Sequence, residues 1–414
     1  MRKQSYDVVV IGCGPCGAVA GRFAAQGGAK TLIIEKKRTV GIPDHDWAGV
    51  FYSWSDAEEM VGIKINPAMI INELEEIAYF SPMGRRGKGL RPPDAKWVDR
   101  NMVDELLAVD AVAAGAELMV DARVSDIVRE GGRVKGVSVN DGRNTIQIDC
   151  KVVIGASGGS NFIPAKVGLQ APQPEGVGMA YELIGFKSLK PGPSTYECYT
   201  GTRHGGTFGH GGLIGQPTKD RLVVGAGTAF GIGKRPRRLK DSLIDLLGAL
   251  EDMGLYDFSK ASTVAMRAGT GVRNWGRPTH HKIVSNGVML AGDAAGQPLV
   301  GSKWGSPGIF TGMFTGRVAG QAAAAAIKDG NVSEDRFVRD YSEVIHDTSR
   351  AEVPKILEAQ KCVEQLARLN PEKLDKAVAD LGEQFGAMRL YVRGALSLSW
   401  CLEPVQEWLR KEAN

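Results

Sequence analysis

The first 35 residues carry the pattern that most limits what this chain can fold into. An apolar stretch at residues 6–11 runs into Gly12-Cys-Gly-Pro-Cys-Gly17, and a second apolar stretch at residues 31–34 ends in Glu35. Strand, glycine-rich turn, helix, strand and terminal acid follow the order of a βαβ unit that binds a dinucleotide. A glycine-rich turn alone arises often by chance, but here both strands and the acid also stand where binding needs them. The sequence therefore predicts a bound dinucleotide whose ribose is held by Glu35.

Each glycine of this turn has its own purpose. Gly12 permits the tight turn, Gly14 lets the backbone approach a pyrophosphate, and Gly17 lets the helix pack closely on the strand. The helix N-terminus adds N–H donors and positive potential. Residues 13–16, Cys-Gly-Pro-Cys, also have the spacing of a thioredoxin-type redox pair. Because these cysteines lie in a loop that should press on phosphate, we favour two small packed side chains over a redox pair.

Composition places the chain in an ordinary class. It has 414 residues, 43% of them hydrophobic and 24% charged, which is typical of a globular protein with two or three domains. A net charge of +4 is too small to indicate nucleic-acid binding. No apolar stretch reaches the roughly 20 residues that span a bilayer, and no secretory signal precedes the first strand, so we expect a cytoplasmic protein with reduced cysteines. Cysteines and histidines show no metal-ligand spacing, and we expect no metal site.

Two later segments indicate which dinucleotide is bound. Residues 152–159 form a strand and a small-residue turn without repeating the first fingerprint, which favours one tightly held dinucleotide. Residues 287–293 read as a buried strand ending in Gly292-Asp293, followed by a glycine-rich loop and a long helix from about Gly308 to Lys328. A carboxylate there can hold a ribityl chain, and the helix N-terminus can stabilise negative charge on a reduced flavin.

These motifs resemble those of the FAD-dependent geranylgeranyl reductase family, within the larger p-hydroxybenzoate-hydroxylase-like flavoprotein group. The resemblance spans most of the chain and further rests on residues 40–43, 98–100, 155–158, 291–296 and 305–309. It implies an α/β fold with a Rossmann-type FAD-binding domain, an inserted antiparallel β-sheet substrate domain and a C-terminal helical region.

The resemblance also implies roles for individual residues. Arg100 would meet the FAD phosphates, Val124 would contact the adenine side through its backbone, Asp293 would bind the ribityl chain, and Gly308-Ile309 would turn beneath the flavin pyrimidine. The residues expected to bind FAD are Gly12, Gly14, Pro15, Cys16, Gly17, Glu35, Lys36, Asp46, Trp47, Gly49, Arg100, Val124, Gly292, Asp293, Gly305, Gly308 and Ile309.

Domain boundaries follow from the order of the motifs. We expect a discontinuous FAD-binding domain at residues 1–75, 97–175 and 265–330, and a substrate domain at 76–96 and 176–264. The remaining residues, 331–414, should be helical. Apolar residues near the end of the chain could cover the substrate cavity or touch a membrane surface. We favour a packed cap, because the basic face of an interfacial helix is thin here.

The sequence departs from the family in the segments expected to contact the flavin ring and the substrate. Residues 43–49 keep the family's proline and glycine but carry Asp46 where a cysteine is usual, residues 212–217 lack the aromatic substrate strand, and a longer loop at 298–308 adds a lysine and a tryptophan. We expect His45 and Asp46 to handle protons. Lys303 should act beside the flavin. The expected substrate contacts are Trp47, Tyr199, His204, His210 and Trp304.

The resulting function is an FAD-dependent oxidoreductase. Its main form is the reduction of a C=C bond in a hydrophobic substrate, isoprenoid-like or otherwise unsaturated, by hydride from reduced flavin N5. The alternative is an aromatic monooxygenase of the same fold, although Ser157-Gly158 stands where the hydroxylases usually carry Asp-Gly. The electron donor stays open between NAD(P)H, ferredoxin and a quinol. Partners are a small hydrophobic or aromatic substrate and this donor; peripheral membrane contact stays open as the alternative to the packed cap, and no nucleic acid is expected.

Overall fold

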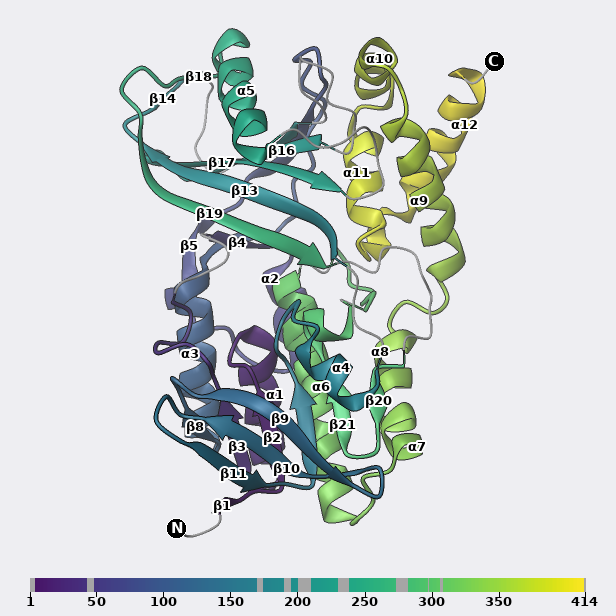
Figure 1. Cartoon of the computed structure of the whole chain (residues 1–414). Helices are drawn as coiled ribbons and strands as arrows, with labels where there is room; N and C mark the ends of the chain where they lie inside the picture. Colours follow the sequence, from purple (N-terminus) through teal and green to yellow (C-terminus); the bar gives the residue numbers. More distant parts are fainter. Residues whose placement is uncertain are drawn as a thin grey trace.

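The structure is a computed structural model that describes residues 4–42, 48–169, 174–189, 195–199, 210–229, 238–272, 282–296, 298–305 and 308–412. An α/β part lies at the bottom of Figure 1, a second sheet above it, and a group of C-terminal helices beside that sheet.

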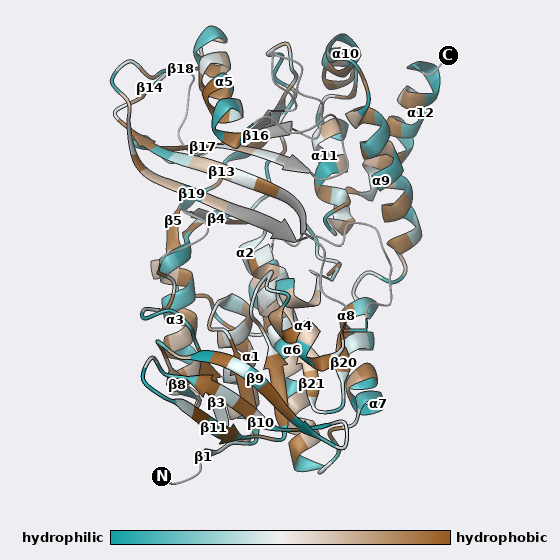
Figure 2. Ribbon diagram, in the orientation of Figure 1, coloured by the Kyte–Doolittle hydropathy of each residue, from teal (hydrophilic) through white to brown (hydrophobic). Residues whose placement is uncertain are grey.

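The lower part is built on a six-stranded sheet with the order β20-β21-β12-β2-β3-β8, in which only β20 is antiparallel. The inner strands β2, β3, β12 and β21 are buried along their whole length, as expected of parallel strands covered on both faces, and Figure 2 colours them mostly hydrophobic. The bounds are β2 Val8–Ile11, β3 Thr31–Ile34, β8 Glu117–Met119, β12 Val152–Gly155, β20 Val284–Ser285 and β21 Val288–Leu290.

Three helices pack with this sheet: α1 Pro15–Gln26, α3 Arg100–Ala113 and α6 Gly308–Lys328. The last has the bounds that the sequence predicts. Helices α1 and α6 approach closely because glycines line their contact. A Cβ on Gly316 would lie 2.3 Å from the carbonyl oxygen of Cys16, and one on Gly320 would lie 2.4 Å from that of Ala20. Side chains at these positions would push the two helices apart.

Two smaller sheets complete the lower part. A four-stranded sheet, β1-β11-β10-β9, contributes to the same hydrophobic core, and a three-stranded sheet, β4-β7-β5, leads into the upper part. The bounds are β1 Gln4–Ser5, β4 Ala48–Phe51, β5 Ile70–Glu73, β7 Lys96–Asp99, β9 Arg123–Glu130, β10 Arg133–Asn140 and β11 Thr145–Asp149, with helices α2 Trp54–Val61 and α4 Phe162–Val167 and 3₁₀ turns at Pro67–Met69 and Gly292–Ala295.

The upper sheet has the order β19-β13-β17-β16-β15-β6, antiparallel except for the pair β15 and β6. Helix α5, Leu239–Asp252, covers one face through leucines that join the core of this sheet. The bounds are β6 Glu76–Phe80, β13 Pro174–Ile184, β15 Thr195–Tyr199, β16 His210–Thr218, β17 Arg221–Ala229 and β19 Ser262–Val272, with a short pair β14 Lys187–Ser188 and β18 Tyr256–Asp257.

Strand β19 changes one expected boundary. It pairs with β13 from Ser262 to Val272, so the upper sheet continues past residue 264, where we expected the FAD domain to resume. The predicted boundary between residues 264 and 265 falls inside β19, because nothing in the local sequence marks where the pairing of this strand ends.

The C-terminal residues do not pack as one unit. Phe337, Tyr341 and Ile345 belong to the core of the α/β part, and the Tyr341 hydroxyl donates to the Leu290 carbonyl at 2.6 Å. The later helices instead form a second core with Tyr79 and with Trp97 of β7. The elements are α7 Glu334–Phe337, a π-helical turn Val338–Ser342, α8 Glu343–Asp347, α9 Val353–Ala367, α10 Pro371–Leu381, α11 Glu383–Tyr391, a 3₁₀ turn Leu396–Cys401 and α12 Leu402–Glu412.

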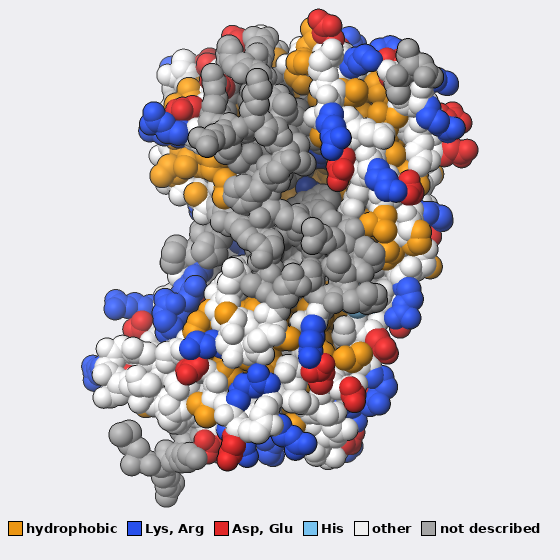
Figure 3. Space-filling model, turned by 45° about the vertical axis from the view of Figure 1, so that its right-hand side comes forward, with side chains coloured by type: hydrophobic (Ala, Val, Ile, Leu, Met, Phe, Trp, Pro, Cys, Tyr) orange, Lys and Arg blue, Asp and Glu red, His pale blue; other side chains and the backbone are white. Residues whose placement is uncertain are grey.

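The surface adds little charge patterning. Basic and acidic side chains are interspersed over the described part of the face in Figure 3, with no broad area of one sign. Among the described helices, none is long and apolar enough to cross a bilayer.

Candidate functional site

The turn between β2 and α1 has the geometry that a dinucleotide needs. Gly12 has a φ of 102°, a left-handed conformation that other residues rarely adopt. A Cβ on Gly17 would lie 1.8 Å from the Gly12 carbonyl oxygen, so α1 can approach the turn only without a side chain there. At Gly14 an added Cβ would meet nothing within 4 Å. Because Pro15 is the first helical residue and no side chain caps α1, the helix N-terminus is left for an anion.

Glu35 ties the turn to the strand beside it. Its side chain is buried, and its two carboxylate oxygens accept hydrogen bonds from the backbone N–H of Cys13 at 2.8 Å and of Lys37 at 2.9 Å. Each oxygen keeps a further lone pair that a ribose hydroxyl could use. The Lys36 side chain is exposed. Val124 is buried in β9. Shortly before it, the N–H groups of Asp121 and Ala122 donate to the carbonyls of Lys37 and Glu35, respectively.

Arg100 is the first residue of α3 and lies near β4, the strand that carries Gly49. A Cβ on Gly49 would lie 2.3 Å from Cδ1 of Ile309 and 3.2 Å from Cδ of Arg100, so the structure brings three expected FAD contacts together from separate segments. Arg100 Nη2 lies 3.3 Å from Oδ1 of Asp104. Burial raises the pKa of the Asp104 carboxyl, and the Arg100 charge partly offsets this. Asp104 was not expected in the site, although its place one helical turn after Arg100 could have indicated it.

Gly292, in the motif at residues 287–293, contacts the glycine-rich turn at residues 12–17. A Cβ there would lie 3.3 Å from both Cβ and Sγ of Cys16 and 3.6 Å from Cα of Gly312. The Gly292 N–H donates to Oγ1 of Thr315 at 3.0 Å. The half-buried Asp293 is thereby held where α1 and α6 meet.

The two cysteines of the turn are buried thiols. Neither forms a disulfide. Burial, with a smaller contribution from the charge of Glu35, raises the pKa of Cys13 to about 12. Burial also raises the pKa of Cys16 to about 12, where the Thr315 hydroxyl lowers it in part and the charge of Asp293 adds to the rise. Since the thiolate is the reactive form, these residues lack the chemistry of a redox pair at neutral pH.

Thiol labelling should reflect this. In the folded protein near neutral pH we expect neither Cys13 nor Cys16 to react with iodoacetamide, because a raised pKa keeps the thiol protonated until the solution is strongly alkaline. Peptide mass spectrometry checks the result, with urea-unfolded protein as the fully labelled control. Rapid labelling of either cysteine in the folded protein would mean that the turn is open and the redox interpretation must be reconsidered.

The loop at residues 298–305, which precedes α6, lies against the end of β4. A Cβ on Gly305 would lie 3.5 Å from a ring carbon of Tyr52, the residue directly after β4. The Lys303 side chain is exposed, and its expected catalytic role stays a prediction. Trp304 is partly buried, and its indole nitrogen is enclosed without a hydrogen-bond partner. Gly308 begins α6.

Other expected site residues cannot be placed. His45, Asp46, Trp47 and His204 lie outside the described residues. Tyr199 ends β15 and His210 begins β16, which puts both in the upper sheet as expected of substrate-domain residues, but their side chains also lie outside the description.

The face of the upper sheet opposite α5 carries a patch of small residues at positions 178, 180, 225 and 227, which sequence reasoning missed; farther along the same face Glu182 is ion-paired with Arg221 and Arg267. Gly178 pairs with Gly227 and Ala180 with Gly225, while the alternate residues of both strands face α5. Among the described residues, a Cβ on Gly178 or Gly227 would meet only a backbone carbonyl, at 3.6 Å. The signal was present as glycine or alanine at alternate positions, 178 and 180 in β13 and 225 and 227 in β17.

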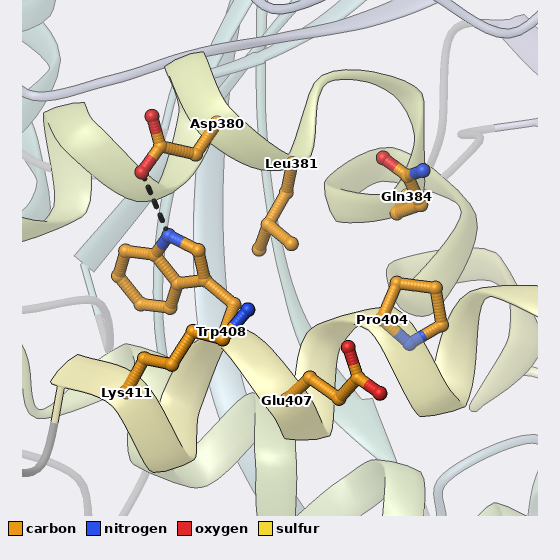
Figure 4. Close-up of a pocket in the computed structure, with 7 residues that line it drawn as sticks. All are labelled: Asp380, Leu381, Gln384, Pro404, Glu407, Trp408 and Lys411. Carbon is orange, nitrogen blue, oxygen red and sulfur yellow. Dashed lines mark hydrogen bonds between the residues drawn. The ribbon is translucent and has the colours of Figure 1, made fainter.

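A hollow of about 200 Å³ lies elsewhere, among α10, α11 and α12 (Figure 4). Its wall includes Trp408, whose indole N–H donates to Asp380 at 2.9 Å. It is remote from the dinucleotide turn (Figure 1) and belongs to the packing of the C-terminal helices. Within the described ranges, acidic, histidine and cysteine side chains form no group that could hold a metal ion.

Two features test whether the residues present fit FAD. The open space beside Gly14 is one that a side chain would fill and that a pyrophosphate can use. The hydroxyl of Ser157 is buried without a hydrogen-bond partner, and the Ser157 Cα would lie 3.4 Å from a Cβ placed on Gly12. A buried hydroxyl normally finds a partner, so a ligand in this turn would complete its bonding. The site fits the cofactor.

Comparisons with known proteins agree with this geometry. The sequence profile of the family described as FAD dependent oxidoreductase matches residues 52–322. Digeranylgeranylglycerophospholipid reductase of Methanosarcina acetivorans is 29% identical over 94% of this chain and 92% of its own length. A reductase of the same name from Methanothermobacter thermautotrophicus is 30% identical over 89% of this chain and 88% of its own.

Solved structures share the fold. A geranylgeranyl bacteriochlorophyll reductase-like protein of Thermoplasma acidophilum superposes with a TM-score of 0.78 at 23% identity, covering 99% of each chain. A flavin-dependent brominase superposes with a TM-score of 0.67 at 18% identity, covering 99% of this chain and 100% of its own.

Proposed function

Because this chain belongs to the FAD-dependent oxidoreductases, and within them to the geranylgeranyl reductase family, we propose that it reduces a C=C bond of a hydrophobic, isoprenoid-like substrate. The observation that supports this most is the likeness to the named lipid reductases, which extends through the FAD-binding part and the upper sheet alike. The electron donor stays open between NAD(P)H, ferredoxin and a quinol.

FAD, when bound and reduced, supplies a hydride from N5. The chain's own residues would hold it: the N-terminus of α1 and Arg100 at the phosphates, Glu35 at the ribose and Asp293 at the ribityl chain. His45 and Asp46 would deliver the proton to the second carbon of the double bond. The patch of small residues at positions 178, 180, 225 and 227 supports the proposal, because it leaves space where a bulky apolar substrate can lie.

Peripheral contact with a membrane is part of this proposal, since such a substrate would be drawn from lipid. Trp400, in the turn before α12, is 44% exposed and offers an apolar side chain for that contact.

The substrate class can be tested by single-turnover oxidation. The dithionite-reduced protein is mixed anaerobically with polyprenyl lipids, enoyl compounds or quinones while the flavin absorbance is followed. We expect reoxidation with polyprenyl lipids and a product carrying added hydrogen at the former double bond, identified by mass spectrometry. If flavin is instead reoxidised only by dioxygen, with coupled hydroxylation of added phenols, the monooxygenase alternative is correct.

Asp293→Ala should weaken FAD retention. A buried hydrogen bond to a charged acceptor contributes on the order of 1.5–3 kcal/mol, so the FAD dissociation constant should rise roughly 10- to 100-fold. Flavin fluorescence on titration of the apoprotein measures it. Asp293→Asn is the matched control, because its amide oxygen can still accept. Equal affinity in Asp293→Ala and the parent would remove Asp293 from the FAD site.

A further inference from the structure

Residues 298–305, here named the flavin loop, are clamped from two sides. On one side stands Asp56, in the first turn of α2, whose Oδ2 accepts the Lys303 backbone N–H at 2.7 Å. The Ser302 hydroxyl accepts the Gly305 N–H at 2.9 Å, and it lowers the pKa of the Asp56 carboxyl. Asp56 therefore holds the loop directly at the Lys303 backbone, and Ser302 ties Gly305 to the residue next to it.

The second side of the clamp is the chain after α11. The Ser302 N–H donates to the Gly394 carbonyl at 2.9 Å, and the Leu396 N–H donates to the Ser302 carbonyl at 2.8 Å. The Ser397 N–H donates to the Lys303 carbonyl at 3.2 Å. These bonds hold the N–H and carbonyl of Ser302 and the carbonyl of Lys303. Among the described hydrogen bonds, the Lys303 N–H is held by Asp56 alone.

The clamp determines what the loop presents to the site. Gly305 is held against Tyr52 and Trp304 lies beside the second core, with its buried indole nitrogen lacking a hydrogen-bond partner. Buried donors are nearly always paired, so this N–H is positioned for an acceptor that a ligand brings. Its direction depends on the backbone of Lys303, the residue before it.

We propose that Asp56 is a positioning residue of the flavin site, whose carboxylate holds the flavin loop closed and fixes Trp304 and Gly305 against the bound cofactor. The proposal rests on FAD binding and does not depend on which substrate is reduced. Burial raises the pKa of Asp56, and the hydrogen bonds from Lys303 and Ser302 lower it in part, as expected of a carboxylate that the loop encloses.

The competing role of Asp56 is local. The hydroxyl of Ser53 caps α2 by accepting the Asp56 N–H at 3.2 Å, and an acid in a first helical turn stabilises the helix by itself. A purely local role predicts a loss of stability on substitution with no change in the loop or the flavin.

Limited trypsin digestion of the holoprotein separates these roles, because Lys303 is exposed and cleavage after it cuts the flavin loop. In Asp56→Ala we expect this cleavage to be roughly 10- to 100-fold faster, since a charged acceptor no longer opposes opening of the loop. Asp56→Asn keeps an acceptor and should stay near the parent. Glu59→Ala removes an exposed acid from the same helix without touching the loop, and serves as the control.

The flavin gives the second readout. Asp56→Ala should shift the two-electron midpoint potential and the visible spectrum of bound FAD, whereas Asp56→Asn and Glu59→Ala should not. Ser302→Ala removes the hydroxyl that holds the Gly305 N–H and leaves α2 and Asp56 in place, so it should loosen the same loop and shift the potential in the same direction if Asp56→Ala fails to fold. Unchanged cleavage at Lys303 and an unchanged potential, in Asp56→Ala or in Ser302→Ala, would overturn the proposal and leave Asp56 as a helix cap.

Discussion

Gly17→Ala is expected to abolish FAD retention and to destabilise the fold. The new Cβ would lie 1.8 Å from the Gly12 carbonyl oxygen, which is backbone and cannot rotate away, so α1 must move off the turn. Overpacking of this kind costs about 1–3 kcal/mol or more in unfolding free energy. Because the turn also forms the pyrophosphate cradle, FAD affinity should fall at least roughly 100-fold. Thermal unfolding of the apoprotein and FAD titration measure the two effects separately.

Gly14→Ala is the matched variant that isolates the cradle. Its φ of −81° suits alanine, and its Cβ would meet nothing within 4 Å, so apoprotein stability should stay within about 0.5 kcal/mol of the parent. The same Cβ would occupy the space assigned to the pyrophosphate, and FAD affinity should fall roughly 10- to 100-fold. Normal FAD binding by Gly14→Ala would show that the phosphates lie elsewhere.

Asp46→Asn should slow substrate-dependent reoxidation of the flavin by about 10²- to 10⁴-fold, the usual contribution of a general acid. Asp46 replaces the family's cysteine in the segment that leads into β4, and Gly49, three residues later, meets Ile309 at the start of α6. The amide keeps the size of the side chain but carries no acidic proton, so FAD binding should be spared.

A single turnover with the true substrate, followed by flavin absorbance, measures the step. His45→Gln tests the second member of the pair in the same assay. If Asp46→Asn and the parent are reoxidised at comparable rates, Asp46 serves only the backbone of its segment and another group supplies the proton.

The elements that could be predicted from sequence are those whose signals are local. The βαβ unit follows from glycine spacing and apolar strands, and α6 from its helical run, so its ends at Gly308 and Lys328 agree with the prediction. The start of α3 also has a local signal, because Asp99 caps it by accepting the N–H groups of Asn101 and Met102.

The features that could not be predicted depend on distant partners. The pairing of β19 with β13 is not written in either strand alone, and neither is the packing of Phe337 and Tyr341 into the FAD-domain core. The insertion in the flavin loop is visible in the sequence, but its anchor Asp56 lies 247 residues away from Lys303. Sequence periodicity reports which face of an element is buried, whereas it does not report what buries it.

The order of strands in the lower sheet has a consequence for how the protein is made. Strand β12 lies between β2 and β21, and α1 packs against α6, so the cofactor turn depends on segments near both ends of the α/β part. On a ribosome, the N-terminal βαβ unit emerges early but lacks the neighbouring strand β12 until residue 155 has been synthesised, and the helix α6 until residue 328. Contacts so distant in sequence form slowly, and the unpaired strand edges stay exposed meanwhile. We therefore expect the N-terminal segment alone not to bind FAD, and the cofactor to bind after α6 has packed on α1.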